Sequence, residues 1–325
     1  MKNITVAVLR GGPSVEYETS METGLNVLTA LHNSLYRTKD IIVTKEGQWL
    51  LDGFHKSPEQ ALFGVDVVFI ALHGFYGEDG TVQRILDRLY IPYIGSRAYP
   101  STLAMNKELA KGHIKNLSVA TPRHMRVTAA GVSSPLKMAE SITRLFGEQY
   151  IIKPLSGGSS FGTRKARNVQ ELGVAITDLI AEYPDLLIEE YIEGREATVG
   201  IIENYRDQLL YDLPVVEIIP PKEETFFSTK AKYSGTSKEI CPGRFTKHQK
   251  LQLAKAAKEI HTTLGLRHYS RSDFIVTDSE IYFLEVNTLP GLTDNSLFPK
   301  ALHAVGGSQD DFVHHLVSRT LEDAV

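Results

Sequence analysis

The sequence has one cysteine, Cys241, among 325 residues, so no disulfide can form within the chain and a reducing compartment fits. It has no run of eighteen apolar residues, which excludes a membrane-spanning helix. Its apolar start, residues 4–9, lacks the length and the cleavage site of a signal peptide. Neither sign of charge dominates, since 35 basic and 39 acidic side chains give a net charge of −4. These absences favour a cytoplasmic protein with no membrane or nucleic-acid partner.

What is present is the composition of a multidomain globular protein. Apolar residues make up 42% and charged residues 23%, and the chain is longer than one hydrophobic core usually supports. Strand and helix signals alternate over residues 1–97, and residues 65–72 form a continuous apolar run typical of a buried parallel strand. We therefore predict an α/β fold with an N-terminal parallel-sheet domain (1–97), a central domain (98–190) and a C-terminal domain (191–325).

Local patterns predict several elements in the second and third domains. The apolar spacing over residues 103–117 indicates one helix. Thr246, with Gln249 three positions later, is typical of a capping box at the start of a helix. Residues 220–244 are polar and rich in Lys, Ser, Thr and Gly, and a loop of that length is often a lid. A hairpin is expected from residues 272–276 to 281–286.

This hairpin places oxygen-bearing side chains on one face. Glu285 and Asn287 alternate along one strand, and Arg271 and Asp273 along the other. A three-residue loop at 278–280 would set Asp273 opposite Glu285, whereas a two-residue loop would split the acidic pair across the two faces. Two close carboxylates need a cation between them, and Mg²⁺ prefers such oxygen ligands. Read alone, the second strand favours a simpler interpretation, a solvated sheet face.

Two further segments have the composition of a nucleotide site. Lys153 ends a strand and precedes the Gly/Ser loop 156–162, whose backbone N–H groups could approach phosphates. The spacing fits neither a Walker A motif nor a dinucleotide fingerprint, and a flexible hairpin loop is an equal alternative. Residues 187–196, LIEEYIEGRE, form a strand on which a purine could stack. A strand end with solvated carboxylates is the alternative for that segment.

Taken together, the chain resembles the D-alanine–D-alanine ligases, a family with the ATP-grasp fold. The segments that carry the resemblance are GGPSVEYETS (11–20), ALHGFYGEDGT (71–81), IPYIGS (91–96), LAMNK (103–107), KPLSGGSSFG (153–162), LIEEYIEGREATV (187–199), LPVVEI (213–218), AKY (231–233), SRSDF (270–274) and LEVNTLPGLTDNSLFP (284–299). Each motif is modestly specific, but ten in one order are very specific. The resemblance implies ATP-dependent joining of two D-alanines through an acyl phosphate, for peptidoglycan precursors.

The resemblance also implies roles for individual residues. The ligands of two Mg²⁺ ions, which Mn²⁺ could replace, would be Asp273, Glu285 and Asn287. The groups that bind ATP would be Lys107, Lys153, Ser159, Ser160, Glu189, Glu190, Tyr191, Ile192, Glu196 and Lys232. The substrate-binding groups would be Glu16 and His73 for the first D-alanine, Ser296 and Leu297 for the second, and Arg271 with the Gly291 N–H for the oxyanion. The Tyr233 hydroxyl, on the predicted lid, would bond toward Ser159 and Glu16 as part of the catalytic set.

Some positions depart from the family's pattern, and some questions stay open. Gly157 stands where the family commonly has an acidic residue, Asn106 where it commonly has Asp, and Ser270 where it commonly has Gly. Tyr233 indicates an amine acceptor but does not separate D-alanine from D-serine. A homodimer is implied by resemblance alone, and K⁺ activation is left open. One rival hypothesis is an ATP-grasp ligase with another acceptor, which Glu16, Ser296 and Leu297 argue against. The other is a non-catalytic nucleotide-binding protein, which would be expected to lack one of Arg271, Asp273, Glu285 or Asn287.

Overall fold

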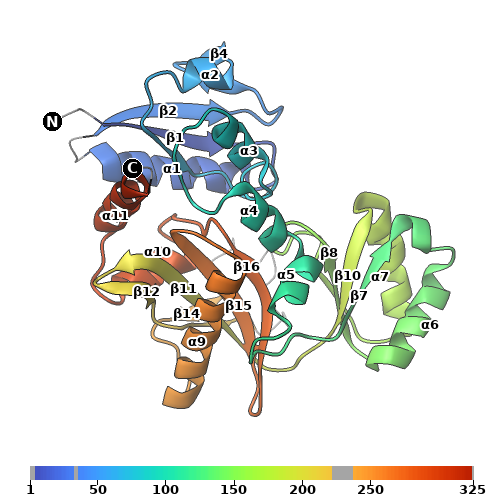
Figure 1. The fold of residues 1–325 in the computed structure, drawn as a ribbon. Coiled ribbons are helices and arrows are strands. Elements are labelled where there is room, and N and C mark those ends of the chain that lie inside the picture. Colours follow the sequence, from blue (N-terminus) through green and yellow to red (C-terminus); the bar gives the residue numbers. More distant parts are fainter. Residues whose placement is uncertain (1–3, 33–35, 222–236, 324–325) are drawn as a thin grey trace.

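The computed structural model describes residues 4–32, 36–221 and 237–323, and these form three β-sheets with helices packed on them (Figure 1). The sheet orders are β4-β3-β2-β1-β5-β6, β7-β10-β8-β9 and β14-β13-β11-β15-β16, with β12 paired to β11. In the described part of the chain, no helix is long and apolar enough to cross a membrane. The mixed α/β architecture agrees with the predicted fold class.

The first sheet confirms the predicted parallel core. Its elements are β1 (Thr5–Gly11), α1 (Tyr17–His32), β2 (Arg37–Val43), β3 (Trp49–Leu51), β4 (Phe54–Lys56), α2 (Pro58–Ala61), β5 (Val67–Ile70), α3 (Thr81–Arg88) and β6 (Tyr93–Ile94). β1 pairs in parallel with both β2 and β5, and β5 pairs in parallel with β6. Every residue of β5 is buried, as expected for a central strand covered on both faces.

The second sheet is antiparallel. The helical segment before it is interrupted at Asn106, a break that the sequence did not indicate. Its part of the chain contains α4 (Ala98–Met105), α5 (Lys107–Ile114), β7 (His124–Thr128), a 3₁₀ turn (Ala129–Gly131), α6 (Pro135–Phe146), β8 (Tyr150–Pro154), β9 (Arg164–Ala166), α7 (Val169–Glu182) and β10 (Asp185–Glu190). The single helix predicted over 103–117 is wrong. Asn106 has extended backbone and caps α5, since its side chain accepts the Leu109 N–H at 3.0 Å.

The third sheet carries the predicted hairpin and the predicted capping box. Its elements are β11 (Arg195–Tyr205), β12 (Gln208–Asp212), β13 (Val216–Ile219), β14 (Lys238–Ile240), α9 (Lys247–Thr263), β15 (Tyr269–Val276), β16 (Ile281–Asn287), α10 (Leu297–His303) and α11 (Gln309–Glu322). Thr246 and Gln249 form both reciprocal bonds of the capping box. Residues 220–244 are not one loop in the part described, because β14 pairs there with β13. Residues 222–236 lie outside the described residues.

The hairpin has the predicted pairing of Asp273 with Glu285, but its turn is shorter than predicted and a β-bulge corrects the register. Asp273 stands opposite Glu285, as expected, but the turn has two central residues, closed by the Thr277 N–H to the Glu280 carbonyl at 3.0 Å. The predicted three-residue loop is therefore wrong. A β-bulge at Leu284, between the Phe274 and Asp273 pairs, supplies the missing residue. The bulge shifts the register by one and brings both carboxylates to the same face.

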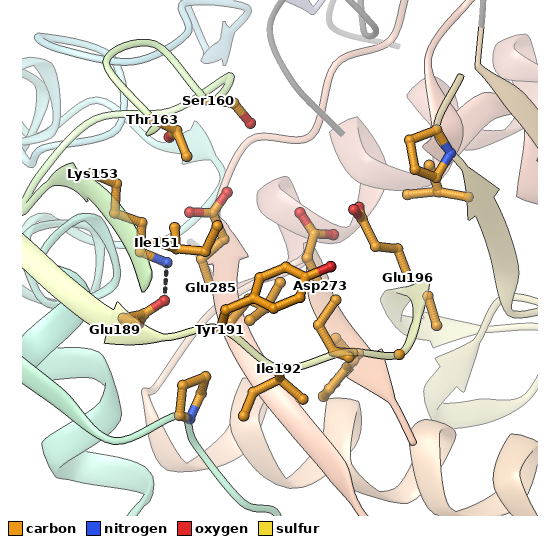
Figure 2. A pocket seen from close by; sticks show the side chains of 18 of the residues that line it. Ile151, Lys153, Ser160, Thr163, Glu189, Tyr191, Ile192, Glu196, Asp273 and Glu285 are labelled. Carbon is orange, nitrogen blue, oxygen red and sulfur yellow. Dashed lines mark ion pairs between the residues drawn. The ribbon is translucent and has the colours of Figure 1, made fainter. Parts of the chain in front are cut away.

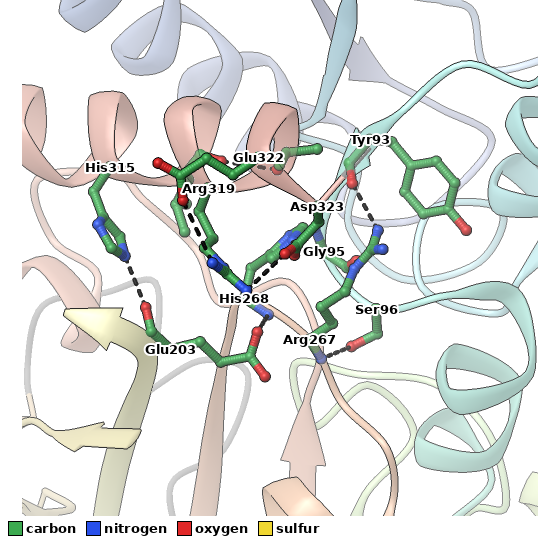
Figure 3. Close-up of polar contacts among 12 residues, drawn as sticks. Tyr93, Gly95, Ser96, Glu203, Arg267, His268, His315, Arg319, Glu322 and Asp323 are labelled. Atoms are coloured by element: carbon green, nitrogen blue, oxygen red, sulfur yellow. Dashed lines mark hydrogen bonds and ion pairs between the residues drawn. The ribbon is translucent and has the colours of Figure 1, made fainter. Parts of the chain in front are cut away.

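The end of the chain returns to the first sheet. α11 contacts α1, β5 and β6, and one apolar core is shared by residues of the first and third sheets. Figure 3 shows polar contacts at this junction, where His268 Nδ1 accepts the Gly95 N–H at 3.0 Å and the His268 N–H donates to Glu203 at 2.7 Å. The His268 Nε2 lies 3.5 Å from Asp323. This histidine therefore joins β6, β11 and the end of α11.

Candidate active site

A cleft of about 430 Å³ lies between the second and third sheets (Figure 2). One wall comes from β8, β10 and the glycine-rich loop after β8, and the other from β11, β13 and the β15–β16 hairpin. The predicted site residues that line it are Lys107, Lys153, Ser160, Glu189, Glu190, Tyr191, Ile192, Glu196, Asp273, Glu285 and Leu297. Segments far apart in the sequence thus meet around one cavity.

Two buried lysines hold the carboxylate of Glu189, which lines one wall of the cleft. Lys153 Nζ lies 2.8 Å from Glu189 Oε2, and Lys111 Nζ lies 3.0 Å from the other oxygen, Oε1. Burial alone would raise the pKa of Glu189, but the two lysine charges lower it to about 2. Burial lowers the pKa of Lys111 to about 8, because the apolar surroundings disfavour its charge. Glu189 is therefore an anion that holds two cations in place.

Lys107 belongs to the same network and connects it to the hairpin. Its Nζ donates to the Gly157 carbonyl at 2.6 Å and lies 3.4 Å from Glu285 Oε2. Lys107 opens α5, so the break at Asn106 aims this side chain at the glycine-rich loop. Sequence reasoning missed Lys111, although it follows Lys107 by four residues, the spacing that places two side chains on one helix face.

The hairpin face carries the acidic set in the expected arrangement. Arg271 makes two bonds to the Asp273 carboxylate, Nε to Oδ1 at 3.0 Å and Nη2 to Oδ2 at 2.9 Å. Asn287 Nδ2 lies 3.2 Å from Asp273 Oδ2. Among the described residues, no three His, Cys, Asp or Glu side chains form a metal-like cluster. The hairpin supplies two carboxylates, Asp273 and Glu285, with one amide, a set of hard oxygen donors.

Groups predicted for the first substrate lie beside the glycine-rich loop. Glu16 is 8% exposed, and its carboxylate accepts a hydrogen bond from the Ser159 hydroxyl. Ser159 and Ser160 both have positive φ, 50° and 58°, so the loop turns sharply here. His73 is buried, with Nε2 2.8 Å from the Thr23 hydroxyl, and burial lowers its pKa. These contacts bring Glu16 and Ser159 together from segments 143 residues apart.

Groups predicted for the second substrate lie after β16. Ser296 is the N-cap residue of α10, and its Oγ accepts the Thr293 N–H at 3.2 Å. A Cβ added at Gly291 would stand 2.8 Å from that same oxygen, so Gly291 and Ser296 are in close contact. Leu297 follows as the first residue of α10 and lines the cleft. Lys232 and Tyr233 lie outside the described residues.

Glu190 and Tyr191 follow one another along the cleft, and both are engaged by cationic side chains. Both carboxylate oxygens of Glu190 are bonded by Arg123, the backbone N–H at 2.8 Å and Nε at 2.7 Å. Arg123 thus holds the Glu190 side chain, and the Glu190 N–H also donates to the Arg123 carbonyl at 3.0 Å. The Tyr191 ring is covered by Lys165 Nζ, 3.3 Å from the ring centroid. This is a cation–π contact, and it fixes the Tyr191 ring at the edge of the cleft.

The departures Asn106, Gly157 and Ser270 have distinct structural consequences. Asn106 caps α5, as described. A Cβ at Gly157 would meet no atom within 4 Å, but φ is +123°, which an L side chain rarely adopts. Ser270 is buried, and its hydroxyl lies 2.7 Å from His261 Nδ1. It therefore packs on the hairpin face opposite Arg271.

Sequence reasoning also missed two buried carboxylates. Glu217, at the rim of the cleft, is held by Arg244 Nε at 3.0 Å and by Arg195 Nη2 at 2.7 Å. Hydrogen bonds from Arg244, and then those from Arg195, lower the pKa of Glu217 to about 2, although burial opposes them. Glu78 is buried on the loop before α3, where burial and the nearby Glu16 charge raise its pKa to about 7. Neither has a short-range sequence pattern that marks it.

Three sheets, with a cleft lined by lysines and an acidic hairpin between the second and the third, are the architecture of the ATP-grasp fold. Residues 114–318 match the family model for the D-ala D-ala ligase C-terminus, and residues 52–96 match that for the N-terminus. The chain is 36% identical to a D-alanine--D-alanine ligase of Syntrophobacter fumaroxidans over 99% of both chains. The protein belongs to the D-alanine–D-alanine ligase family.

Solved structures give the same result. D-alanyl-alanine synthetase A from Vibrio cholerae matches with a TM-score of 0.85 and 27% identity, covering 99% of this chain and 100% of that one. The VanG D-Ala:D-Ser ligase from Enterococcus faecalis matches with a TM-score of 0.83 and 27% identity, covering 98% and 100%. Relatives with different second substrates therefore share this fold.

Proposed function

We propose that this protein uses ATP to join two D-alanines into D-alanyl-D-alanine for peptidoglycan precursors. The observation that carries the proposal is the placement of three groups in a member of this family, two of them lining one cleft and the third beside it. The lysines and the acidic hairpin line the cleft, and in the substrate set of Glu16, Ser159, Gly291 and Ser296, two members directly precede the lining residues Ser160 and Leu297. A nucleotide-binding protein without catalysis would not need the third group.

ATP would lie in the cleft with its phosphates beside the lysines. Lys107 and Lys153 are buried point charges near the glycine-rich loop, suited to phosphate oxygens. Residues 189–192 and Glu196 would hold the base and the ribose. The proposed assignment includes Ser160 and, outside the described residues, Lys232.

The residues of the hairpin fit a hard divalent cation. Asp273, Glu285 and Asn287 would ligate Mg²⁺, two ions with Mn²⁺ as a substitute, and the metal when bound would neutralise charge on the phosphates. Asp273 is held by Arg271 through two bonds, so its orientation is fixed before any ligand arrives. The fit rests on donor chemistry, because two carboxylates and one amide oxygen suit this cation.

The reaction would proceed in two steps. Glu16 would hold the ammonium of the first D-alanine, with His73 nearby, while the carboxylate attacks the γ-phosphate and gives an acyl phosphate and ADP. The amine of the second D-alanine, held at Ser296 and Leu297, then attacks that carbonyl and phosphate leaves. Arg271 and the Gly291 N–H would stabilise the tetrahedral oxyanion. Tyr233 would complete the set with Ser159.

The acceptor and the assembly are finer points of the proposal. The VanG structure, a D-Ala:D-Ser ligase, makes D-serine the main alternative acceptor. We keep the division into domains at 1–97, 98–190 and 191–325 as part of the proposal. A homodimer working in the cytoplasm is proposed from the family resemblance.

The test is phosphate release with Mg-ATP and D-alanine, with the product identified by mass. L-alanine and a mixture without amino acid are the controls. Release with D-alanine alone, together with a dipeptide mass, supports the proposal. Release without a dipeptide would assign another acceptor, and ATP binding without release would favour a non-catalytic protein.

A further inference from the structure

Glu78 is a buried carboxylate to which the proposed chemistry assigns no role. It lies on the loop between β5 and α3 and is 9% exposed. Its Oε2 accepts the Gly74 N–H at 2.9 Å, and its own N–H donates to the Gly74 carbonyl at 2.8 Å. These two bonds close the loop 73–78 on itself, with Gly74 at φ +69°.

The other carboxylate oxygen reaches a distant segment. Glu78 Oε1 accepts the Leu289 N–H at 3.0 Å and lies 3.3 Å from the Thr288 hydroxyl. Both oxygens therefore meet donors, an arrangement that an ionised carboxylate satisfies completely. The bond to Leu289 spans 211 residues of sequence. One side chain thus joins the loop 73–78 to the segment 288–291.

The two joined segments carry groups on opposite sides of the proposed reaction. His73, assigned to the first D-alanine, precedes Gly74, and Gly291, assigned to the oxyanion, follows Leu289 by two residues. A second link lies nearby, where the Thr23 hydroxyl is 2.8 Å from His73 Nε2 and accepts the Leu292 N–H at 3.4 Å. The Thr23 link is longer at Leu292 and is made by one hydroxyl, whereas Glu78 accepts from three donors, so Glu78 is the stronger tie.

We propose that Glu78 is a positioning residue that fixes the segment 288–291 against the loop 73–78, and so sets the oxyanion donor Gly291 relative to the first-substrate groups. This role rests on the proposed function. Glu78 acts through the amides of Gly74 and Leu289 and is not among the residues that line the nucleotide cleft. Its loss should therefore affect D-alanine and leave ATP binding unchanged.

The informative variant is Glu78→Gln. An amide has one acceptor oxygen and one NH₂ group, so the NH₂ must face either the Gly74 or the Leu289 N–H. The two segments then separate without loss of side-chain volume. A displacement of about 1 Å at reacting groups costs on the order of 100-fold in rate. We expect kcat/KM for D-alanine to fall by about that factor, with the Kd of ATP changed by less than about twofold.

The matched control is Gln83→Met. Gln83 is buried on the adjoining α3, and its Nε2 donates to the Gly77 carbonyl at 2.6 Å. Losing this bond loosens the loop 73–78 from the other side, but Gln83 has no bond to 288–291 among those described. We expect a lower Tm in this variant, with kcat/KM for D-alanine close to the parent value.

Hydrogen exchange measured by mass spectrometry tests the link without any substrate. Glu78→Gln should speed exchange in peptides covering both 73–78 and 288–292, whereas Gln83→Met should speed it in the first alone. Unchanged exchange at 288–292 in Glu78→Gln overturns the proposal, as does equal loss of kcat/KM in both variants. If Glu78→Gln does not fold, Thr288→Val removes one of the three donors and should raise exchange at 288–292. No rise there also overturns it.

The exchange result separates this inference from the proposed function. If the parent protein releases no phosphate with D-alanine, the ligase proposal fails while the exchange experiment still decides whether Glu78 joins the segments. If the parent is active and Glu78→Gln keeps full kcat/KM for D-alanine, the ligase proposal stands and the role of Glu78 is refuted.

Discussion

Protonation of His268 should weaken the junction between the first and third sheets. His268 Nδ1 accepts the Gly95 N–H, so a proton on Nδ1 would place two N–H groups face to face. Burial, and then the Arg267 charge, lowers the pKa of His268 to about 3, with Arg319 and His315 adding to the effect. The opposing charge of Glu203 is not enough to reverse it. The ring is therefore neutral in the folded protein at every pH above that value.

The sign of the effect follows from the two pKa values. The unfolded chain binds a proton at this ring below a pKa of 6.5, and the folded protein does so only near 3. The contribution of His268 to stability is therefore full above pH 6.5 and is lost as the pH falls toward 3. Between about pH 7.5 and pH 5 the loss amounts to roughly 2 kcal/mol in the free energy of unfolding.

The assay is urea unfolding of the parent and of His268→Asn at several pH values from about 7.5 to 5. Asn suits this site because φ is +67°, a backbone that Asn tolerates better than most residues, and because it does not titrate. Other buried histidines, such as His73, affect both proteins and cancel in the comparison. The parent should lose about 2 kcal/mol more than the variant over this range. If the parent and His268→Asn lose the same free energy of unfolding over this pH range, to within about 0.5 kcal/mol, the reasoning is refuted.

Three further outcomes test the site and the packing. Asp273→Asn should fold but abolish ADP release, because it removes a charge from the acidic set; release near the parent rate would contradict that role. Lys111→Met leaves Glu189 buried with one cation fewer, and should lower the free energy of unfolding by about 3 kcal/mol in urea. Gly200→Ala would place a Cβ 2.8 Å from the Phe298 ring, and should cost about 1–3 kcal/mol, seen as a lower Tm.

Elements with a strong local pattern could be predicted from the sequence. The capping box at Thr246 and the buried strand at 67–70 depend only on residues a few positions apart in the sequence, and both are confirmed. The helix break at Asn106 was missed because the apolar spacing continues across it. An extended residue there aligns Lys107 with the Gly157 carbonyl, a contact fifty residues away in sequence. Tertiary contact thus overrode local periodicity.

The hairpin shows the same limit in a different form. Alternation correctly placed Asp273 and Glu285 on one face, but the loop length that would pair them was wrong. The bulge at Leu284 corrects the register, and no local signal in the strand indicates it. Glu78 and Lys111 were missed for a related reason, since their partners lie in other parts of the chain.

The ion pairs of the cleft bear on how a nucleotide would enter it. Lys153 and Lys107 are already paired, with Glu189 and Glu285, so phosphate oxygens must compete with carboxylates for them. The competition differs between the two. Glu189 keeps Lys111 as a second cation when Lys153 turns to a phosphate, so its buried charge stays compensated. Glu285 lies on the hairpin face proposed to bind the metal, so the cation would compensate its charge when Lys107 turns to a phosphate. The proposed cation would therefore favour the transfer of Lys107 from Glu285 to a phosphate, and nucleotide affinity at this end of the cleft should rise with Mg²⁺.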